Sequence, residues 1–170
     1  MPLWLHLSIH FLLAVLVGWI FWRASKFRCL SFIAAIMGGF LIDVDHIIEY
    51  IIVFHRFSFY GFINGWQFLW SGKSYLIFHA WEFLPILLLL AYLLRRRQKI
   101  AIFLAVLAAA GAVHLATDCL INRYPLEFYS LDHRLLHRFS AQELIPAQNM
   151  ELNQWYYQKW FGEMEREAVK

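Results

Sequence analysis

The sequence of 170 residues has few charged side chains: aspartate, glutamate, lysine and arginine make up only 16% of it. Hydrophobic residues reach 61% and aromatic residues 19%, which excludes a disordered chain and is too apolar for an ordinary water-soluble domain. The basic residues give a net charge of +3 and form no patch of the kind that binds nucleic acid. The two cysteines, Cys29 and Cys119, lie in apolar runs, so we expect neither a disulfide framework nor a zinc knuckle.

Long apolar runs dominate what is present. Four of them, residues 3–22, 29–54, 76–94 and 100–121, approach or exceed the ~20 residues that a helix needs to cross ~30 Å of hydrocarbon. We therefore predict an all-α polytopic membrane protein with a bundle of four transmembrane helices in residues 1–122. Residues 149–170 carry apolar side chains near helical spacing, so we predict an extramembrane or interfacial helical tail over 123–170.

The connections between these runs differ in basic charge. Residues 23–28 carry three lysines and arginines and residues 95–99 carry four, whereas residues 55–75 carry two. By the positive-inside rule, the first and third connections face the cytoplasm. We expect the chain in a bacterial inner or plasma membrane, with residues 55–75 and the tail on the periplasmic or outer side.

Acidic residues are missing from the same connections. Before residue 123 the sequence has five acids, and all of them fall inside predicted spans: Asp43, Asp45, Glu49, Glu82 and Asp118. A carboxylate at the centre of a bilayer costs about 2.5–3.5 kcal/mol even on an insertion scale. Solvated charges would be distributed in the opposite way, so these acids indicate a functional site inside the membrane.

Histidines accompany these acids at helical spacing. Three pairs are three or four residues apart, which places both side chains of a pair on one face of a helix. Together with a histidine of the first span, they give seven predicted metal ligands near the outer ends of their spans: His10, Asp43, His46, His79, Glu82, His114 and Asp118. So many ligands predict two divalent ions. We expect zinc, while iron and manganese also suit histidine and carboxylate ligands.

Asp45 and Glu49 are left for other roles. On a regular helix Asp45 points about 160° away from Asp43, so it either supports a ligand or marks a locally unwound helix. One of the two is the predicted general base, and Glu49 is alternatively a further ligand or a hydrogen-bond acceptor. His6, one turn before His10, is expected at the membrane interface.

These motifs resemble a known family. The glycine-rich run that ends in Asp43-Val44-Asp45-His46, with His10 before it and His79 and Gly111–Asp118 after it, is similar to the membrane-bound metal-dependent hydrolases. That family is also described as LexA-binding, inner-membrane-associated hydrolases. The resemblance covers residues 6–121 and implies hydrolase activity. Ile42 stands where many members have proline. There is a weaker similarity to zinc-dependent phospholipase C.

Two functions remain open at this point. The first is a membrane-embedded hydrolase that acts on a lipid-linked or interfacial ester or phosphoester through a metal-activated water, with its site facing the periplasm. The alternative is a di-iron or other redox bundle, or a metal transporter, without hydrolase activity. A transporter would need ligands at both depths of the membrane, and the inner half has none. The oligomeric state is not predicted.

Overall fold

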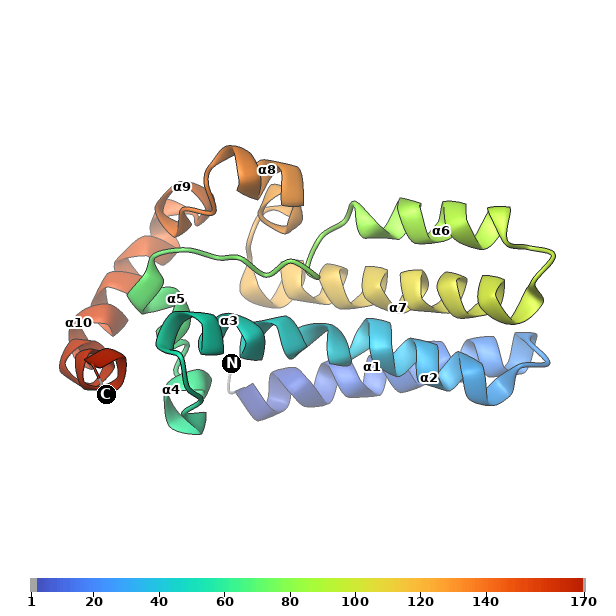
Figure 1. Cartoon of the computed structure of the whole chain (residues 1–170), viewed down its shortest axis with the longest axis horizontal. Coiled ribbons are helices and arrows are strands. Elements are labelled where there is room, and N and C mark those ends of the chain that lie inside the picture. The colour runs from blue at the N-terminus through green and yellow to red at the C-terminus, as the bar shows by residue number, and fades with distance from the viewer. Residues whose placement is uncertain (1–2, 170) are drawn as a thin grey trace. The chain divides into compact units, whose positions relative to one another are not determined.

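The computed structural model describes residues 3–169, without the side chains of residues 3, 4 and 148. Helices follow one another along this part of the chain, as the all-α prediction requires (Figure 1). By their packing the residues form two units. The first unit comprises the chain up to Asp43 together with Phe78–Arg123, and the second comprises Val44–Ile77 and the chain from Tyr124 onward. This grouping differs from the predicted division after residue 122, because residues 44–77 pack with the tail.

The described residues of the first unit form four α-helices and one 3-10 turn. They are α1 (Leu3–Ala24), α2 (Arg28–Gly39), η1 (Leu41–Asp43), α6 (Phe83–Leu93) and α7 (Gln98–Asn122). The four α-helices lie side by side, and α7 contacts each of the other three (Figure 1). Small residues let them approach closely: Ala34, Ala35 and Ala110 are fully buried, and a Cβ on Gly39 would lie 2.9 Å from the Cβ of Ala14.

Two helices are long and apolar enough to cross a membrane, at Leu5–Ala24 and Gln98–Asn122. A third candidate arises if Arg28–Gly39 and Leu41–Phe54 are counted as one bent span. The predicted span 76–94 is corrected to a helix of 11 residues, Phe83–Leu93. Pro85 explains the late start, because in a longer helix its ring would clash with the carbonyl of residue 81. The chain is thus consistent with membrane association through two or three spans.

The predicted helix over 29–54 is also interrupted. It ends at Gly39, continues as a single 3-10 turn to Asp43, and α3 begins at Val44. Two consecutive glycines, Gly38 and Gly39, weaken the helix at this point. Asp43 and Asp45 therefore belong to different elements, which is the locally unwound arrangement that their sequence spacing allowed.

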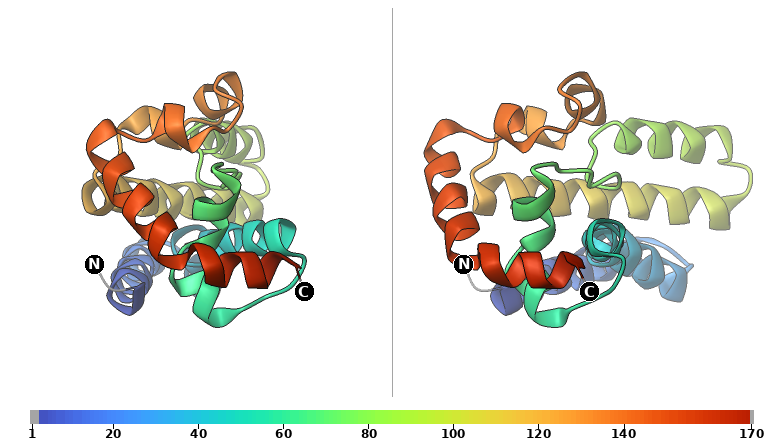
Figure 2. Two further views of the ribbon diagram at one scale, coloured as in Figure 1. Left: turned by 90° about the vertical axis from the view of Figure 1, so that its left-hand side faces the viewer. Right: turned by 60° about the vertical axis from the view of Figure 1, so that its left-hand side comes forward.

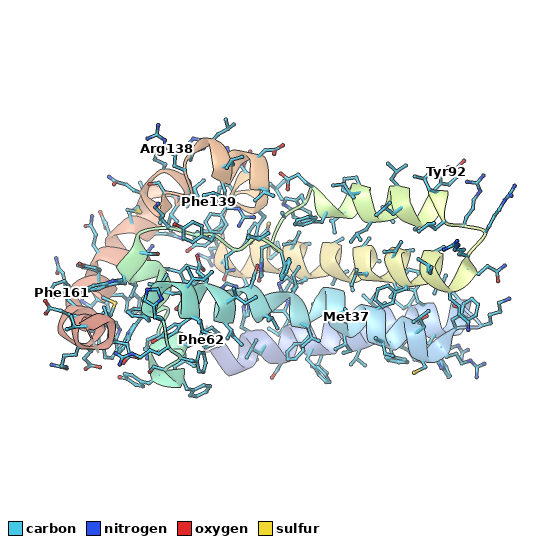
Figure 3. The ribbon with its side chains drawn as sticks, in the orientation of Figure 1. Met37, Phe62, Tyr92, Arg138, Phe139 and Phe161 are labelled. Atoms are coloured by element: carbon cyan, nitrogen blue, oxygen red, sulfur yellow. The ribbon has the colours of Figure 1, made fainter. Side chains whose placement is uncertain are left out.

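The outer surface of the first unit is apolar along its length and basic at one end. Met37 and Tyr92 are 44% and 61% exposed, and Tyr92 lies at the outer edge of the molecule in Figure 3. The connections α1–α2 and α6–α7 lie at the same end of the unit, where Arg23 stacks over Trp19, Arg28 over Trp22, and Arg95 over Tyr92. A belt of aromatic rings with basic side chains is typical of a membrane–water interface.

The second unit is built from short helices and one long one. They are α3 (Val44–Phe54), α4 (Phe59–Ile63), α5 (Trp66–Ser71), η2 (Leu126–Tyr129), α8 (Leu131–Leu136), α9 (Ala141–Leu144) and α10 (Ala147–Val169). The predicted tail helix corresponds to α10, drawn in red in Figure 2, which contacts α5 and α3. Met164 of α10 is fully buried with Tyr50, Phe54 and Trp66. One side of the tail helix thus packs on the protein itself.

Arg134 braces an extended stretch of the second unit. Its side chain is fully buried, and Nη1 donates to the main-chain oxygens of Leu76 at 2.6 Å and Tyr75 at 3.1 Å. Nearby, Ser74 N donates to the oxygen of Phe139 at 2.9 Å. A guanidinium can satisfy several carbonyls at once, so one buried charge here replaces the hydrogen bonds of a regular strand or helix.

Candidate metal centre

Six histidine and aspartate side chains gather at one end of the first unit. They come from four segments of the unit: His6 and His10 from α1, Asp43 from the end of η1, His79 from the turn before α6, and His114 and Asp118 from α7. This is the end where α1 and α6 begin and α7 ends, opposite the basic connections (Figure 1). Alternating helix directions bring residues far apart in sequence to one level.

Asp118 lies between two pairs of histidines. Its Oδ1 atom is 3.1 Å from Nε2 of His10 and 3.3 Å from Nε2 of His6. Its Oδ2 atom is 3.2 Å from Nε2 of His114 and 3.6 Å from Nε2 of His79. Each carboxylate oxygen therefore faces a different pair of imidazoles.

Asp43 approaches the second of these pairs. Its Oδ1 atom lies 3.2 Å from Nε2 of His79 and 3.4 Å from Nε2 of His114. The two histidine nitrogens are 3.1 Å apart, and the corresponding nitrogens of His6 and His10 are 2.9 Å apart. Ligand atoms bound tetrahedrally at 2.0–2.1 Å to one zinc ion are separated by about 3.3 Å. The spacings in the cluster, from 2.9 to 3.6 Å, thus suit ligands that share an ion.

A hydrogen bond on the side of the ring away from the cluster fixes the orientation of His114. Its Nδ1 atom is 3.2 Å from the main-chain oxygen of Gly39, and because a carbonyl only accepts, Nδ1 carries the proton. The other ring nitrogen, Nε2, faces the cluster and is the atom that would bind a metal ion. A helix leaves its last carbonyls without partners inside the helix, so the end of α2 at Gly39 supplies this acceptor. Such a hydrogen bond is what holds a metal-binding histidine in its tautomer.

The cluster is almost entirely withdrawn from solvent. The side chains of His10, His79, His114 and Asp118 are at most 4% exposed, and the rings of His10 and His114 stack with centroids 3.9 Å apart. His6 and Asp43 are the more open members, at 18% and 15%. Buried carboxylates and imidazoles require compensation, and a cation among them would supply it. The groups His6–His10–Asp118 and His79–His114–Asp118 could each hold a metal ion.

Within the first unit, five of the seven predicted ligands lie together: His10, Asp43, His79, His114 and Asp118. The helical pairing of His79 with Glu82 was wrong, because α6 begins only at Phe83. Glu82 is the half-buried residue before that helix and belongs to neither of these two groups of described residues. His79 instead reaches the cluster from a turn.

His6 is a member of the cluster that was not among the predicted ligands. It was expected at the membrane interface, whereas its Nε2 atom lies within 3.3 Å of both His10 and Asp118. The signal was present in the sequence, since His6 and His10 are four residues apart and share one face of α1. The two rings meet edge to face with centroids 4.4 Å apart.

The other three predicted site residues, Asp45, His46 and Glu49, lie on α3 in the second unit. Asp45 and Glu49 share the buried face of that helix, and Glu49 Oε1 accepts a hydrogen bond from Tyr75 N at 2.6 Å. The ring of His46 packs edge to face against Phe68. The ligand role of His46 and the general-base role of Asp45 or Glu49 stay predictions.

Two further basic residues of the second unit have structural partners. Arg56 pairs with the carboxylate of Glu167 at 2.9 Å and donates to the main-chain oxygens of Arg166 and Glu167, so it caps the end of α10. His137 donates through Nδ1 to the oxygen of His133 at 2.8 Å, closing the last turn of α8. These contacts account for both side chains without a substrate.

Comparisons of the chain with protein-family models, with curated proteins and with solved structures gave no match. The resemblance to membrane-bound metal-dependent hydrolases therefore stays a prediction from motifs.

Proposed function

We propose that this chain is a membrane-embedded, metal-dependent hydrolase that acts on a lipid-linked or interfacial ester or phosphoester. Two divalent ions, zinc in the first instance, would be held by His6, His10, Asp43, His79, His114 and Asp118. The single observation that carries the proposal is the position of Asp118, whose two oxygens face different histidine pairs. A carboxylate placed in this way can bridge two ions, and paired ions are a recurrent device of hydrolytic enzymes.

The kinds of ligand favour hydrolysis over the redox alternative. Four-helix di-iron proteins typically use four carboxylates and two histidines. The cluster has the reverse proportion, with four histidines and two aspartates. Imidazole-rich sites suit zinc, which has no redox chemistry of its own.

Each residue has a part in the proposed reaction. Bound ions would supply a Lewis acid and lower the pKa of a bound water towards 7. Asp118 would hold the two ions at a fixed separation, while the hydrogen bond from His114 to Gly39 keeps that imidazole aimed at the cluster. The burial of His10, His79 and His114 keeps bulk water away from the charges and strengthens every interaction among them. Asp45 or Glu49 is the proposed general base.

The apolar surroundings support a lipid-borne substrate. The cluster is at one end of two helices that are long enough to span a bilayer, and the basic, aromatic connections are at the opposite end. A site near one membrane surface suits a scissile bond close to a lipid headgroup. The positive-inside rule favours the periplasmic or outer surface.

The proposal is tested with the full-length protein in detergent micelles. Chromogenic carboxylic esters, phosphomonoesters and phosphodiesters, each with a long acyl chain, would be offered to the metal-loaded and the chelator-treated protein. We expect one class to be hydrolysed by the loaded protein only, and added zinc to restore the lost activity. His114→Ala should be inactive, whereas His133→Ala, which changes a histidine of the second unit, should keep full activity. A metal-loaded protein that hydrolyses none of these classes would contradict the proposed reaction.

A further inference from the structure

We infer that the two halves of the cluster are unequal metal positions, and that His6 is a ligand of the weaker, exchangeable one. The inference rests on the metal centre of the proposed function and adds to it a regulation by metal supply. The His6 position is defined by His6, His10 and Asp118 Oδ1, and the His79 position by His79, His114 and Asp118 Oδ2.

His6 lies where a ligand of a metal ion at this position would lie. Its Nε2 atom lies 2.9 Å from Nε2 of His10 and 3.3 Å from Oδ1 of Asp118. These three atoms make three short contacts with one another, and a single proton on one of them cannot turn all three contacts into hydrogen bonds. One cation at their centre would attract all three atoms. Without His6, only one histidine and one carboxylate oxygen would remain at this position.

The two positions differ in the number of donors. The His6 position has three. The His79 position has a further carboxylate beside it, because Asp43 Oδ1 lies 3.2 and 3.4 Å from the nitrogens of His79 and His114. Sites closed by four protein ligands hold zinc as a structural ion, while sites with three leave a coordination place open.

The positions also differ in how their histidines are supported. His114 donates through Nδ1 to the oxygen of Gly39, which raises its basicity. The corresponding Nδ1 atom of His10 is buried and has no hydrogen-bond partner in the part of the chain that the structure describes. A ligand without this support binds its metal less tightly, by about 10–100-fold.

His6 is also more exposed than either histidine of the His79 position. The side chain of His6 is 18% exposed, against 1% for His79 and none for His114, while Asp43 beside the His79 position is 15% exposed. His6 is also in the first turns of α1, and helix ends open more readily than helix centres. An ion at the His6 position can therefore leave while the other stays. Occupancy of the His6 position, and with it the activity, would follow the supply of free metal.

Cobalt titration tests the inference. Metal-free full-length protein in detergent is titrated with Co²⁺, which reports ligation through its visible absorption, and native mass spectrometry counts the bound ions. We expect two equivalents in the wild type, the second bound about 10–100-fold more weakly. His6→Ala should bind one equivalent with unchanged affinity. Leu16→Ala, which truncates an exposed side chain of the same helix, should behave like the wild type.

A second variant reads ligation directly. In a background with Cys29→Ser and Cys119→Ser, His6→Cys should restore the second equivalent and add a near-ultraviolet thiolate-to-cobalt absorption band. The inference would be overturned if His6→Cys bound two equivalents without that band. It would also be overturned if His6→Ala bound cobalt as the wild type does, or if it lost both ions. Each of these results would leave the proposed metal centre standing. A wild-type protein that takes up one ion, unaffected by His6→Ala, would overturn it too. Wild-type protein that binds no cobalt would remove the metal centre itself.

Discussion

His114 donates a hydrogen bond through Nδ1 to the main-chain oxygen of Gly39, 75 residues earlier in the chain, over 3.2 Å. The bond ties the end of α2 to a side chain of α7 and aims the imidazole at the cluster. It exists only because α2 and α7 approach closely. A Cβ on Gly38 would run into the main-chain carbonyl of Leu107 on α7.

Gly38→Ala should therefore harm both packing and metal binding. Forcing a methyl group against a main-chain carbonyl costs about 1–3 kcal/mol of unfolding free energy. By displacing α2 it should also weaken the orientation of His114 and lower metal affinity by about 10–100-fold. Thermal unfolding in detergent and metal titration measure the two effects.

Gly162→Ala is the matched control. Gly162 lies inside α10, and a Cβ there would meet nothing within 4 Å. Alanine favours a helix over glycine by about 0.5–1 kcal/mol, so this variant should be as stable as the wild type or slightly more so. Equal stability of Gly38→Ala and the wild type would show that α2 and α7 are not in close contact at Gly38.

Arg134→Ala should strongly destabilise the second unit. The buried guanidinium donates to the oxygens of Tyr75 and Leu76, and hydrogen bonds from a charged group contribute about 1.5–3 kcal/mol each. Arg134→Lys should rescue little, because an ammonium lacks the planar fork of donors. Limited proteolysis of the segment around Tyr75 would report its release. Arg138→Ala, at an exposed arginine labelled in Figure 3, should leave the cleavage rate unchanged. If Arg134→Ala resisted proteolysis as well as the wild type does, the hydrogen bonds of Arg134 would not be what holds the segment around Tyr75 in place.

Labelling of single cysteines tests the predicted orientation of the chain in a membrane. In a protein with Cys29→Ser and Cys119→Ser, Lys73→Cys should react with an impermeant reagent in intact spheroplasts. Lys26→Cys and Arg96→Cys, in the two strongly basic connections, should react only after permeabilisation. All three native side chains are exposed, so burial would not confuse the result. The opposite pattern would place the metal centre on the cytoplasmic side.

Much of the first unit could be read from the sequence. The apolar runs located α1 and α7 nearly to the residue, and the acids and histidines inside those runs pointed to the end at which the cluster forms. The spacing of Asp43 and Asp45 allowed for a locally unwound helix, and the second run is interrupted there. These features depend on local composition and on the 3.6-residue period, and both are visible in a single sequence.

The predictions that failed depended on the three-dimensional surroundings of residues, which a single sequence does not show. Pro85 lies in the mostly apolar run 76–94, so hydropathy extended a helix through residues that form turns. His6 had a plausible role at the interface, and only the position of Asp118, over a hundred residues later, makes it part of the cluster. The packing of residues 44–77 with the tail depends on side chains such as Tyr50 and Met164, whose contact no spacing rule predicts.

The metal-to-protein ratio of the purified full-length chain tests the central claim most directly. Elemental analysis of folded, monodisperse protein should find two divalent ions per chain, and His133→Ala should keep both. Asp118→Asn should lower the content sharply, because one carboxylate serves both positions and its loss leaves buried histidines without a negative partner. Folded wild-type protein without bound metal after purification in the presence of zinc would contradict the account.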